Sequence, residues 1–252
     1  MYEMIKQKQS ELAACMPQSP EFISWLQQSD LWCWLYSFLR IQGEKVSKNS
    51  IVAAFSGDLK DDIPLSLYAF VKNYKDVYQD MKTSLAMEDT LSLKMLNRWA
   101  GMLLDKDDAV PEETLYRTRN PIVYEWELIP VHFREIREEL SGVLKAAAAV
   151  KNPKDPLDKA AFVHLEIDRL YPYGEATALV SSAALLYELM RLGLHAPQLP
   201  VGDVEYNKMI AKYAEDRDRS DFTDMLSRSV YNRLEAVLSV ARQAKDAEEG
   251  NI

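Results

Sequence analysis

The sequence predicts a mostly α-helical protein that contains one β-hairpin. Apolar residues recur at helical spacing through most of the chain, and only 8 of its 252 residues are glycine. The period changes to two residues at 122–129, where every second side chain is apolar or aromatic: Ile122, Tyr124, Trp126 and Leu128. Residues 116–119 can supply the partner strand across Asn120-Pro121, a turn-forming pair. We therefore expect a single hairpin within a helical fold.

Breakers and caps delimit the helices before the hairpin. Pro17 and Pro20 end the first helix, and the second carries an aromatic-rich stripe that we expect to face the core. Ser47 or Asn49 can cap the third helix, and the turn that ends in Pro64 precedes the fourth. The expected helices are residues 2–15, 21–40, 47–56, 64–82 and 90–104.

Similar signals define the helices after the hairpin. Asp155 can cap a helix that has Pro156 at its first position, and Gly193 suits the C-terminal stop of the helix that follows. We expect the tail at 246–252 to fray. The expected helices are residues 131–150, 155–170, 175–192, 201–214 and 218–245.

Composition and charge limit the classes of partner. The net charge is −9 and the isoelectric point is about 5.0, with no basic stripe, so nucleic acid is not an expected partner. No apolar run approaches the length of a membrane span, and the first residues lack the apolar core of a signal peptide. Cys15 and Cys33 are expected to be two buried free thiols in a reducing compartment, with a disulfide as the alternative. The sequence thus predicts a cytoplasmic protein with no membrane partner.

The stretch at 160–179 carries the most informative pattern. Ala160-Ala161 and His164 precede a run that reads Tyr171-Pro172-Tyr173-Gly174-Glu175-Ala176-Thr177-Ala178-Leu179. This run resembles the signature of the Fic (filamentation-induced) family, His-Pro-Phe-x-Asp/Glu-Gly-Asn-Gly-Arg, which often follows an Ala-Ala pair and a second His. The proline, the aromatic residue and the acid are in register. The reactive positions differ: Tyr171 for the His, Ala176, Thr177 and Ala178 for Gly-Asn-Gly, Leu179 for the Arg, and Ser182 for a second Arg.

Residues 115–132 resemble the flap of the same family, a hairpin that lies over the active site and holds a target segment by strand pairing. The resemblance implies that five residues dock a target there: Arg119, Ile122, Val123, Tyr124 and Trp126. Across the hairpin, ordinary surface pairs are expected between Arg117 or Arg119 and Glu125 or Glu127. Residues 90–235 fit the family's order of elements. The resemblance therefore implies a Fic-like core at 83–245, preceded by an N-terminal helical region at 1–82.

A weaker resemblance lies at 37–47. Many Fic proteins carry an inhibitory helix with Ser/Thr-x-x-x-Glu-Gly, whose Glu reaches the second motif Arg and prevents productive ATP binding. Here Phe38 stands for the Ser or Thr and Gln42 for the Glu, while Gly43 is in register. Because Ser182 stands for the Arg, both ends of that ion pair are missing.

The substitutions bear on the chemistry that the resemblance implies. The family's His accepts a proton from the target hydroxyl, whereas Tyr171, with a reference pKa near 10, would be about 0.1% phenolate at neutral pH. We expect Tyr171 to pack at a helix end; a hydroxyl donor and a self-modified acceptor are the alternatives. Ala176 and Ala178 lack the backbone freedom of the glycines that they replace, and Leu179 cannot bind phosphate as an arginine does. A helix N-terminus at this position could still bind an anion weakly. Glu175 keeps the acid that holds Mg²⁺ in the family, or serves only as an acid in the first turn of a helix.

Three functions are compatible with this pattern. The favoured one is a catalytically degenerate Fic protein that binds an unidentified protein partner, with the hairpin edge as one surface and no cofactor. The alternative is an active Fic-type transferase with a rewired site, which moves AMP or another phosphate-containing group from a nucleotide to a protein hydroxyl with ATP and Mg²⁺. The third is a sensor whose pocket binds a different small ligand. The resemblance also leaves a homodimer open.

Overall fold

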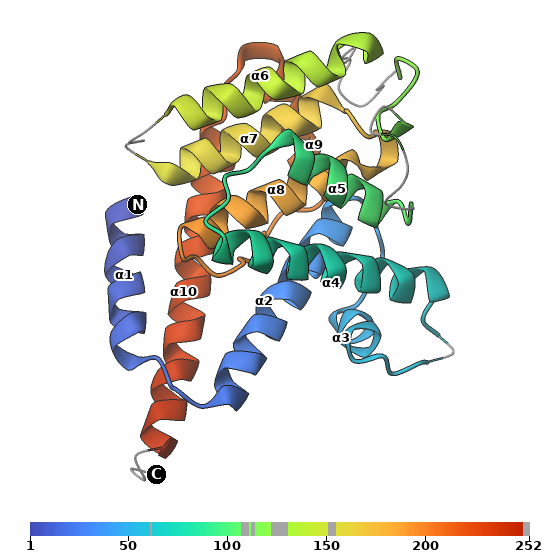
Figure 1. Cartoon of the computed structure of the whole chain (residues 1–252). Helices are drawn as coiled ribbons and strands as arrows, with labels where there is room; N and C mark the ends of the chain where they lie inside the picture. Colours follow the sequence, from blue (N-terminus) through green and yellow to red (C-terminus); the bar gives the residue numbers. More distant parts are fainter. Residues whose placement is uncertain (61, 107–110, 112–113, 122–130, 151–154, 249–252) are drawn as a thin grey trace.

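The computed structural model describes residues 1–60, 62–106, 111, 114–121, 131–150 and 155–248 (Figure 1). In this part of the chain every regular element is helical, so the mostly α-helical fold that the sequence predicts is confirmed. The elements are α1 (Tyr2–Cys15), α2 (Pro20–Ile41), α3 (Lys48–Ser56), α4 (Leu65–Ala86), α5 (Leu93–Leu103), the 3₁₀ turn η3 (Phe133–Glu135), α6 (Ile136–Ala149), α7 (Pro156–Leu170), the 3₁₀ turn η4 (Gly174–Ala176), α8 (Thr177–Arg191), α9 (Asp203–Asp216) and α10 (Ser220–Glu248).

Local sequence sets the helix starts. Ser47, the first of the two predicted caps for α3, accepts a backbone N–H at 3.0 Å. Asp155 caps α7 by accepting the N–H of Leu157 at 2.9 Å, and Pro156 takes the first helical position, where its missing N–H is not needed. These capping bonds satisfy backbone donors that a helix end otherwise leaves unpaired.

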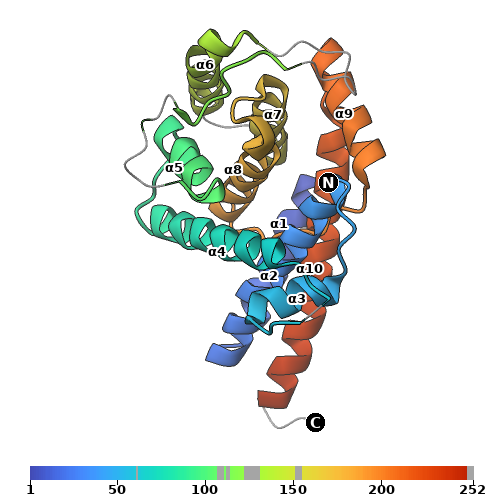
Figure 2. The same ribbon diagram turned by 90° about the vertical axis from the view of Figure 1, so that its right-hand side faces the viewer.

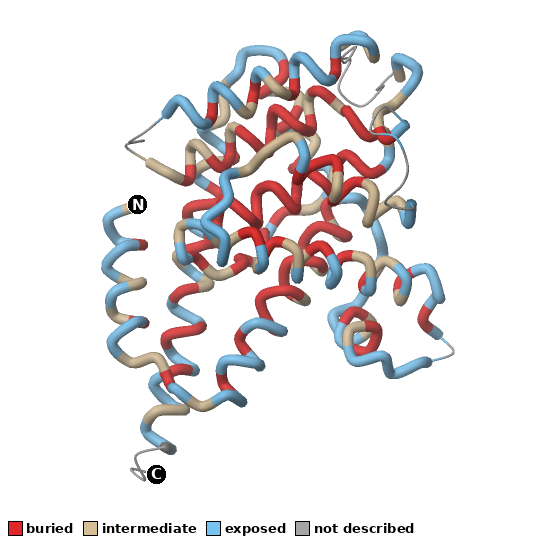
Figure 3. Tube along the Cα trace, viewed as in Figure 1, coloured by how far each residue is buried: buried red, intermediate tan, exposed pale blue. Residues whose placement is uncertain are grey.

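Helices α7 and α8 form the centre of the protein. Every residue from Val180 to Leu189 in α8 is buried, which is the pattern of a helix covered on all sides (Figure 3). Helix α7 packs against α8, α6, α9 and α10, while α4 and α5 cover α8 from the other side. In Figure 2 the pair lies between α5 and α6 on one side and α9 and α10 on the other. The central position of α7 and α8 fixes the turn between them, where the motif lies.

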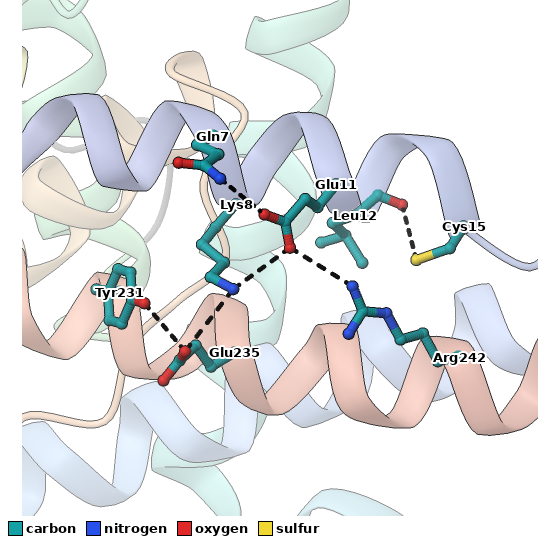
Figure 4. A network of polar contacts seen from close by, with 8 residues as sticks. All are labelled: Gln7, Lys8, Glu11, Leu12, Cys15, Tyr231, Glu235 and Arg242. Atoms are coloured by element: carbon teal, nitrogen blue, oxygen red, sulfur yellow. Dashed lines mark hydrogen bonds and ion pairs between the residues drawn. The ribbon is translucent and has the colours of Figure 1, made fainter.

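The N-terminal helices contribute to the same apolar core. Helix α2 packs on α3, α4 and α9, and its Trp34 and Phe38 are almost fully buried. Helix α1 buries Ile5 and Leu12 against α10. Beside these apolar contacts, Glu11 of α1 pairs with Arg242 of α10 at 3.5 Å (Figure 4). The first and last helices of the described chain therefore lie side by side.

The predicted hairpin differs from the structure in its first half. Residues 116–119 form no strand; instead the Arg117 N–H donates to the Pro172 carbonyl at 2.9 Å. The Tyr116 ring stacks on Tyr173, with ring centroids 5.6 Å apart. The prediction of a strand here was wrong because these contacts draw the segment onto the turn after α7. The second half of the predicted hairpin, with Ile122, Val123, Tyr124 and Trp126, lies outside the described residues.

Two further sequence predictions concern the cysteines and membrane-spanning helices. Cys15 is half-buried, Cys33 is buried, and both are free thiols, as predicted. Among the helices described here, none combines the length and apolarity that crossing a bilayer requires.

Candidate functional site

The junction between α7 and α8 holds the motif in a tight turn. Tyr171 ends α7 with φ 49° and ψ 52°, and its N–H donates to the carbonyls of Ile167 and Asp168 at 3.1 Å each. This left-handed conformation costs a residue with a Cβ about 1–2 kcal/mol, so neighbouring contacts must hold it. Tyr171 thus lies at a helix end, where the sequence places it, and its side chain is half-buried.

Arg117 holds the turn from outside. Its guanidinium donates to the carbonyls of Tyr171 at 2.8 Å, of Leu170 at 3.4 Å and of Val131. Burial lowers the pKa of Arg117, and the nearby Tyr171 opposes that effect. Sequence reasoning missed this role, since it paired Arg117 with acids of the hairpin that lie outside the described residues. Arg119 is exposed, and its carbonyl accepts another Arg117 N–H at 3.1 Å.

Side chains within the motif close the turn from inside. The Tyr173 N–H donates to Thr177 Oγ1 at 3.0 Å, and the Tyr173 hydroxyl donates to Asn97 Oδ1 at 2.7 Å. Tyr173, Ala176 and Thr177 are all buried. The turn is therefore packed by its own side chains at the positions where the resemblance places the phosphate-binding loop.

A chain of buried hydrogen bonds occupies the position of the second motif Arg. Ser182 is fully buried and donates to the Leu179 carbonyl at 2.7 Å. Its Oγ also lies 3.0 Å from the Tyr74 hydroxyl, which accepts the indole N–H of Trp34 at 3.1 Å. All of these partners are uncharged. Phe38, at the Ser/Thr position of the inhibitory segment, is buried beside Trp34 with ring centroids 4.7 Å apart.

A second polar cluster joins α7, α8 and α9. Asp168 is buried and accepts hydrogen bonds from the hydroxyls of Ser181 and Tyr206. Since Tyr206 gives its proton to Asp168, His164 Nε2 must donate to the Tyr206 oxygen, 2.6 Å away. Burial lowers the pKa of His164, against the opposing Asp168 charge, and burial and that charge both raise the pKa of Tyr206. His164 is therefore a neutral side chain packed between helices.

A cavity of about 350 Å³ opens beside the motif, between the end of α2, the α7–α8 turn and the start of α9. Its charged side chains are Asp168, Glu175 and Asp203; Asp168 is buried, and the other two are exposed. Within the described lining there is no Lys, Arg or His. The cavity is lined by Ile41, Gln42, Asp168, Tyr171, Glu175, Thr177, Ala178, Asp203, Tyr206 and Asn207.

The structure brings some of the predicted site residues together and separates others. Five of them line this cavity: Gln42, Tyr171, Glu175, Thr177 and Ala178. Leu179 lines a neighbouring cavity of about 390 Å³, which also reaches Gln42. Three others are buried in the core: Phe38, Ala176 and Ser182. Gly43 follows α2 with φ 79°, a conformation that favours glycine.

Two acids of the cavity were missed at the sequence level. Asp168 follows His164 by four residues, which places both on one helix face, so that spacing was a usable signal. Asp203 comes from α9, 24 positions after Leu179 (203 − 179), and nothing in the neighbouring sequence marks it. Among the described residues, no group of three His, Cys, Asp or Glu side chains is placed to hold a metal ion. Metal binding by Glu175 therefore stays a prediction.

Comparison with known proteins shows which solved structures have a similar fold. No protein-family model and no curated protein sequence matches this chain. A Fic domain containing signaling protein from Bacteroides thetaiotaomicron is similar with a TM-score of 0.76 and 16% identity, over 95% of this chain and 98% of the other. Fic-1 from C. elegans has a TM-score of 0.71 and 16% identity over 96% and 73% of the two chains. A Fic family protein from Desulfovibrio desulfuricans has 0.61 and 15% over 97% and 75%. This chain therefore has the fold of the Fic-domain proteins.

Proposed function

We propose that this Fic-fold protein does not transfer nucleotides and acts by binding another protein. The observation that carries the proposal is the charge of the cavity beside Tyr171, where three carboxylates and no cation stand among the described lining residues. A nucleoside triphosphate is an anion, and proteins that bind one place Lys, Arg, a metal ion or free backbone N–H groups around it. Three carboxylates repel such a ligand in a site that is partly screened from water.

Arg117 is a cation bonded to the turn, and its geometry argues against a phosphate role. Its guanidinium already donates to the Tyr171 and Leu170 carbonyls and to Asn120 Oδ1 at 3.1 Å. Binding a phosphate would break these bonds and release the strained Tyr171 backbone. Arg117 is therefore a residue that positions the turn.

The groups that could accept a proton also support the proposal. Tyr171 carries a phenol at the position of the family's histidine, and a phenol is a poor general base at neutral pH. His164 is fully buried and donates to Tyr206 through Nε2. A target hydroxyl has no route to that imidazole without opening the packing of α7 on α9.

Protein binding is the function that we propose in place of the transfer chemistry. One of the similar structures is described as a signaling protein, which fits a role in recognition. Docking through the edge of the predicted hairpin stays part of the proposal; only Arg119 of that predicted surface lies among the described residues, and it is exposed.

An active transferase is the second candidate, and one observation favours it. Glu175 keeps the acid of the motif, and its exposed side chain lines the cavity. In that case Glu175 would hold Mg²⁺, which usually shares its coordination with the phosphates of a bound nucleotide. Another group would have to take the proton from the target hydroxyl.

Calorimetric titration with ATP and ADP, each with and without Mg²⁺, separates the two candidates. We expect no heat of binding from a protein whose helical circular dichroism and cooperative thermal unfolding show that it is folded. Micromolar, Mg²⁺-dependent binding that Glu175→Ala abolishes would establish the transferase candidate instead. Glu205→Gln is the control, since Glu205 is an exposed acid on α9 outside the cavity lining.

A further inference from the structure

We propose that the cavity beside Tyr171 receives a lysine side chain of the partner protein. This inference rests on the proposed function, because it names the chemistry of the partner at that site. The starting point is the lining, which holds three carboxylates: Glu175 and Asp203 are exposed, and Asp168 is buried with 3% of its surface exposed. A ligand that enters this cavity meets negative charge from both exposed and buried side chains.

The helix ends and the hydrogen-bond partners of Asp168 do not cancel the charge of the three acids. Helices α2 and α7 end at the cavity and η4 and α9 begin there, so the partial charges of the helix ends include both signs. The hydroxyls of Ser181 and Tyr206 that bind Asp168 are neutral donors, and burial and the Asp168 charge hold the Tyr206 proton in place. The three carboxylates therefore set the sign of the potential.

The arrangement of the acids distinguishes an organic cation from a metal ion. In the described part of the chain no three acidic or imidazole side chains converge on one point, as Mg²⁺ or Ca²⁺ would need. The volume of about 350 Å³ falls instead at the lower end of the range for small-ligand pockets, about 300–1,000 Å³. A cation on a long stem can carry its charge into a cavity of this size.

The remaining lining suits a lysine. Ile41 and Ala178 supply apolar surface for methylene groups, and long cationic side chains commonly bury their stems in this way. Tyr171 also lines the cavity, and aromatic rings attract cations. Gln42 and Asn207 are lining residues whose side-chain amides can accept hydrogen bonds, and three rotatable ammonium donors adapt to such acceptors more readily than the planar fork of an arginine.

The test is an NMR titration of the full chain with two peptides that differ in one group. The first is acetyl-Gly-Ser-Lys-Ser-Gly-amide, and the second carries Nε-acetyl-lysine, which keeps the stem and removes the charge. We expect the lysine peptide to bind weakly, with a Kd of about 1 mM, and to shift the amides around Glu175 and Asp203. The acetylated peptide should bind at least about tenfold more weakly. Equal binding of the two peptides, or shifts clustered elsewhere, would overturn the inference.

A matched pair of double variants distinguishes the effect of the acids in this cavity from the effect of net charge on peptide binding. Glu175→Gln with Asp203→Asn removes two exposed acids of the lining, and Glu205→Gln with Glu215→Gln removes two exposed acids of α9 outside the lining. Both change the net charge by the same amount. The first should weaken binding of the lysine peptide about fourfold, at about twofold for each exposed pair, and the second by less than about twofold. An equal loss in both variants would mean non-specific attraction and would overturn the proposal.

Titrations with other ligands distinguish a lysine side chain from other cations. They also distinguish failure of the lysine inference from failure of the proposed function. MgCl₂ alone should cause no shift at Glu175, and a shift there that competes with the peptide would assign the site to a metal ion. Spermine that binds the same amides more tightly than the peptide would assign it to a free polyamine. If neither the peptide nor ATP binds, the lysine inference fails and the proposed function stands. If Mg²⁺-ATP binds and the peptide does not, both fail.

Discussion

The hydrogen-bond chain beneath the candidate site allows a quantitative test of the packing that replaces the second motif Arg. Trp34 donates to Tyr74, and Ser182 gives its own proton to the Leu179 carbonyl. Tyr74 must therefore be the donor in its 3.0 Å contact with Ser182. Tyr74→Phe removes the hydroxyl at the middle of this chain without changing the ring that fills the core.

The magnitude follows from the burial of the partners. Trp34, Tyr74 and Ser182 are all fully buried, so water cannot replace the lost hydroxyl. Tyr74→Phe leaves the Trp34 indole N–H without an acceptor, at a cost of about 1–3 kcal/mol. We therefore expect the free energy of unfolding to fall by about 2 kcal/mol. Ser182→Ala leaves the Tyr74 proton without an acceptor and should cost about 1 kcal/mol. The double variant should cost no more than Tyr74→Phe alone, because the hydroxyl that Ser182→Ala leaves unpaired is already absent.

Urea unfolding followed by far-ultraviolet circular dichroism measures these differences. Tyr36→Phe is the matched control on α2, since the Tyr36 ring packs under Arg40 and Lys48 at 5.6 and 5.4 Å and phenylalanine keeps that ring. We expect the control to change stability by less than about 0.5 kcal/mol. A Tyr74→Phe variant as stable as the control, or costs that add in the double variant, would refute the assigned proton directions.

Two further predictions concern the turn and the buried histidine. Arg117→Ala should lower the free energy of unfolding by at least about 2 kcal/mol, from about 1 kcal/mol for each of its bonds to the Tyr171 and Leu170 carbonyls, and speed hydrogen exchange across 170–178. Exposed Arg119→Ala is the control, and equal exchange in both variants would contradict the role of Arg117. For His164, burial lowers the folded-state pKa below the unfolded value of about 6.5. Between these two pKa values the unfolded chain binds a proton that the folded chain does not bind. The free energy of unfolding therefore falls as the pH drops below about 6.5 toward the folded pKa. His164→Gln should flatten the dependence of the urea midpoint on pH between about 7.5 and 5.5; an unchanged slope would show that other groups cause it.

Helix positions were predictable because short-range signals set them. The sequence predicts a helix at 155–170 from Asp155 and Pro156, and α7 runs from Pro156 to Leu170 with that cap in place. The predicted first helix, 2–15, has the same bounds as α1. Ser47 was one of two candidate caps, and only the structure distinguishes it from Asn49. In each case the deciding residues lie within a few positions of the helix end.

Contacts of the candidate site were not predictable, because they join distant parts of the chain. Arg117 and Tyr171 are 54 positions apart, and Tyr74 and Ser182 are 108 apart. Sequence proximity instead suggested hairpin acids as partners of Arg117. The same limit applies to the cavity: the motif predicts Tyr171 and Glu175, but the charge of the site also depends on an acid from α9. Spacing identifies residues that share a helix face, and packing decides which faces meet.

The pairing of α1 with α10 bears on the order in which the chain folds. Glu11 and Arg242 are separated by 231 positions, so this helix pair is a contact of very long sequence separation (Figure 4). During synthesis the apolar side of α1, with Ile5 and Leu12, has no α10 to cover it until nearly all of the described chain has left the ribosome. Non-local contacts of this kind slow folding and leave apolar surface open to aggregation or chaperones in the interval. The final docking of α1 is therefore expected to be a late step, made after the α7–α8 centre has formed.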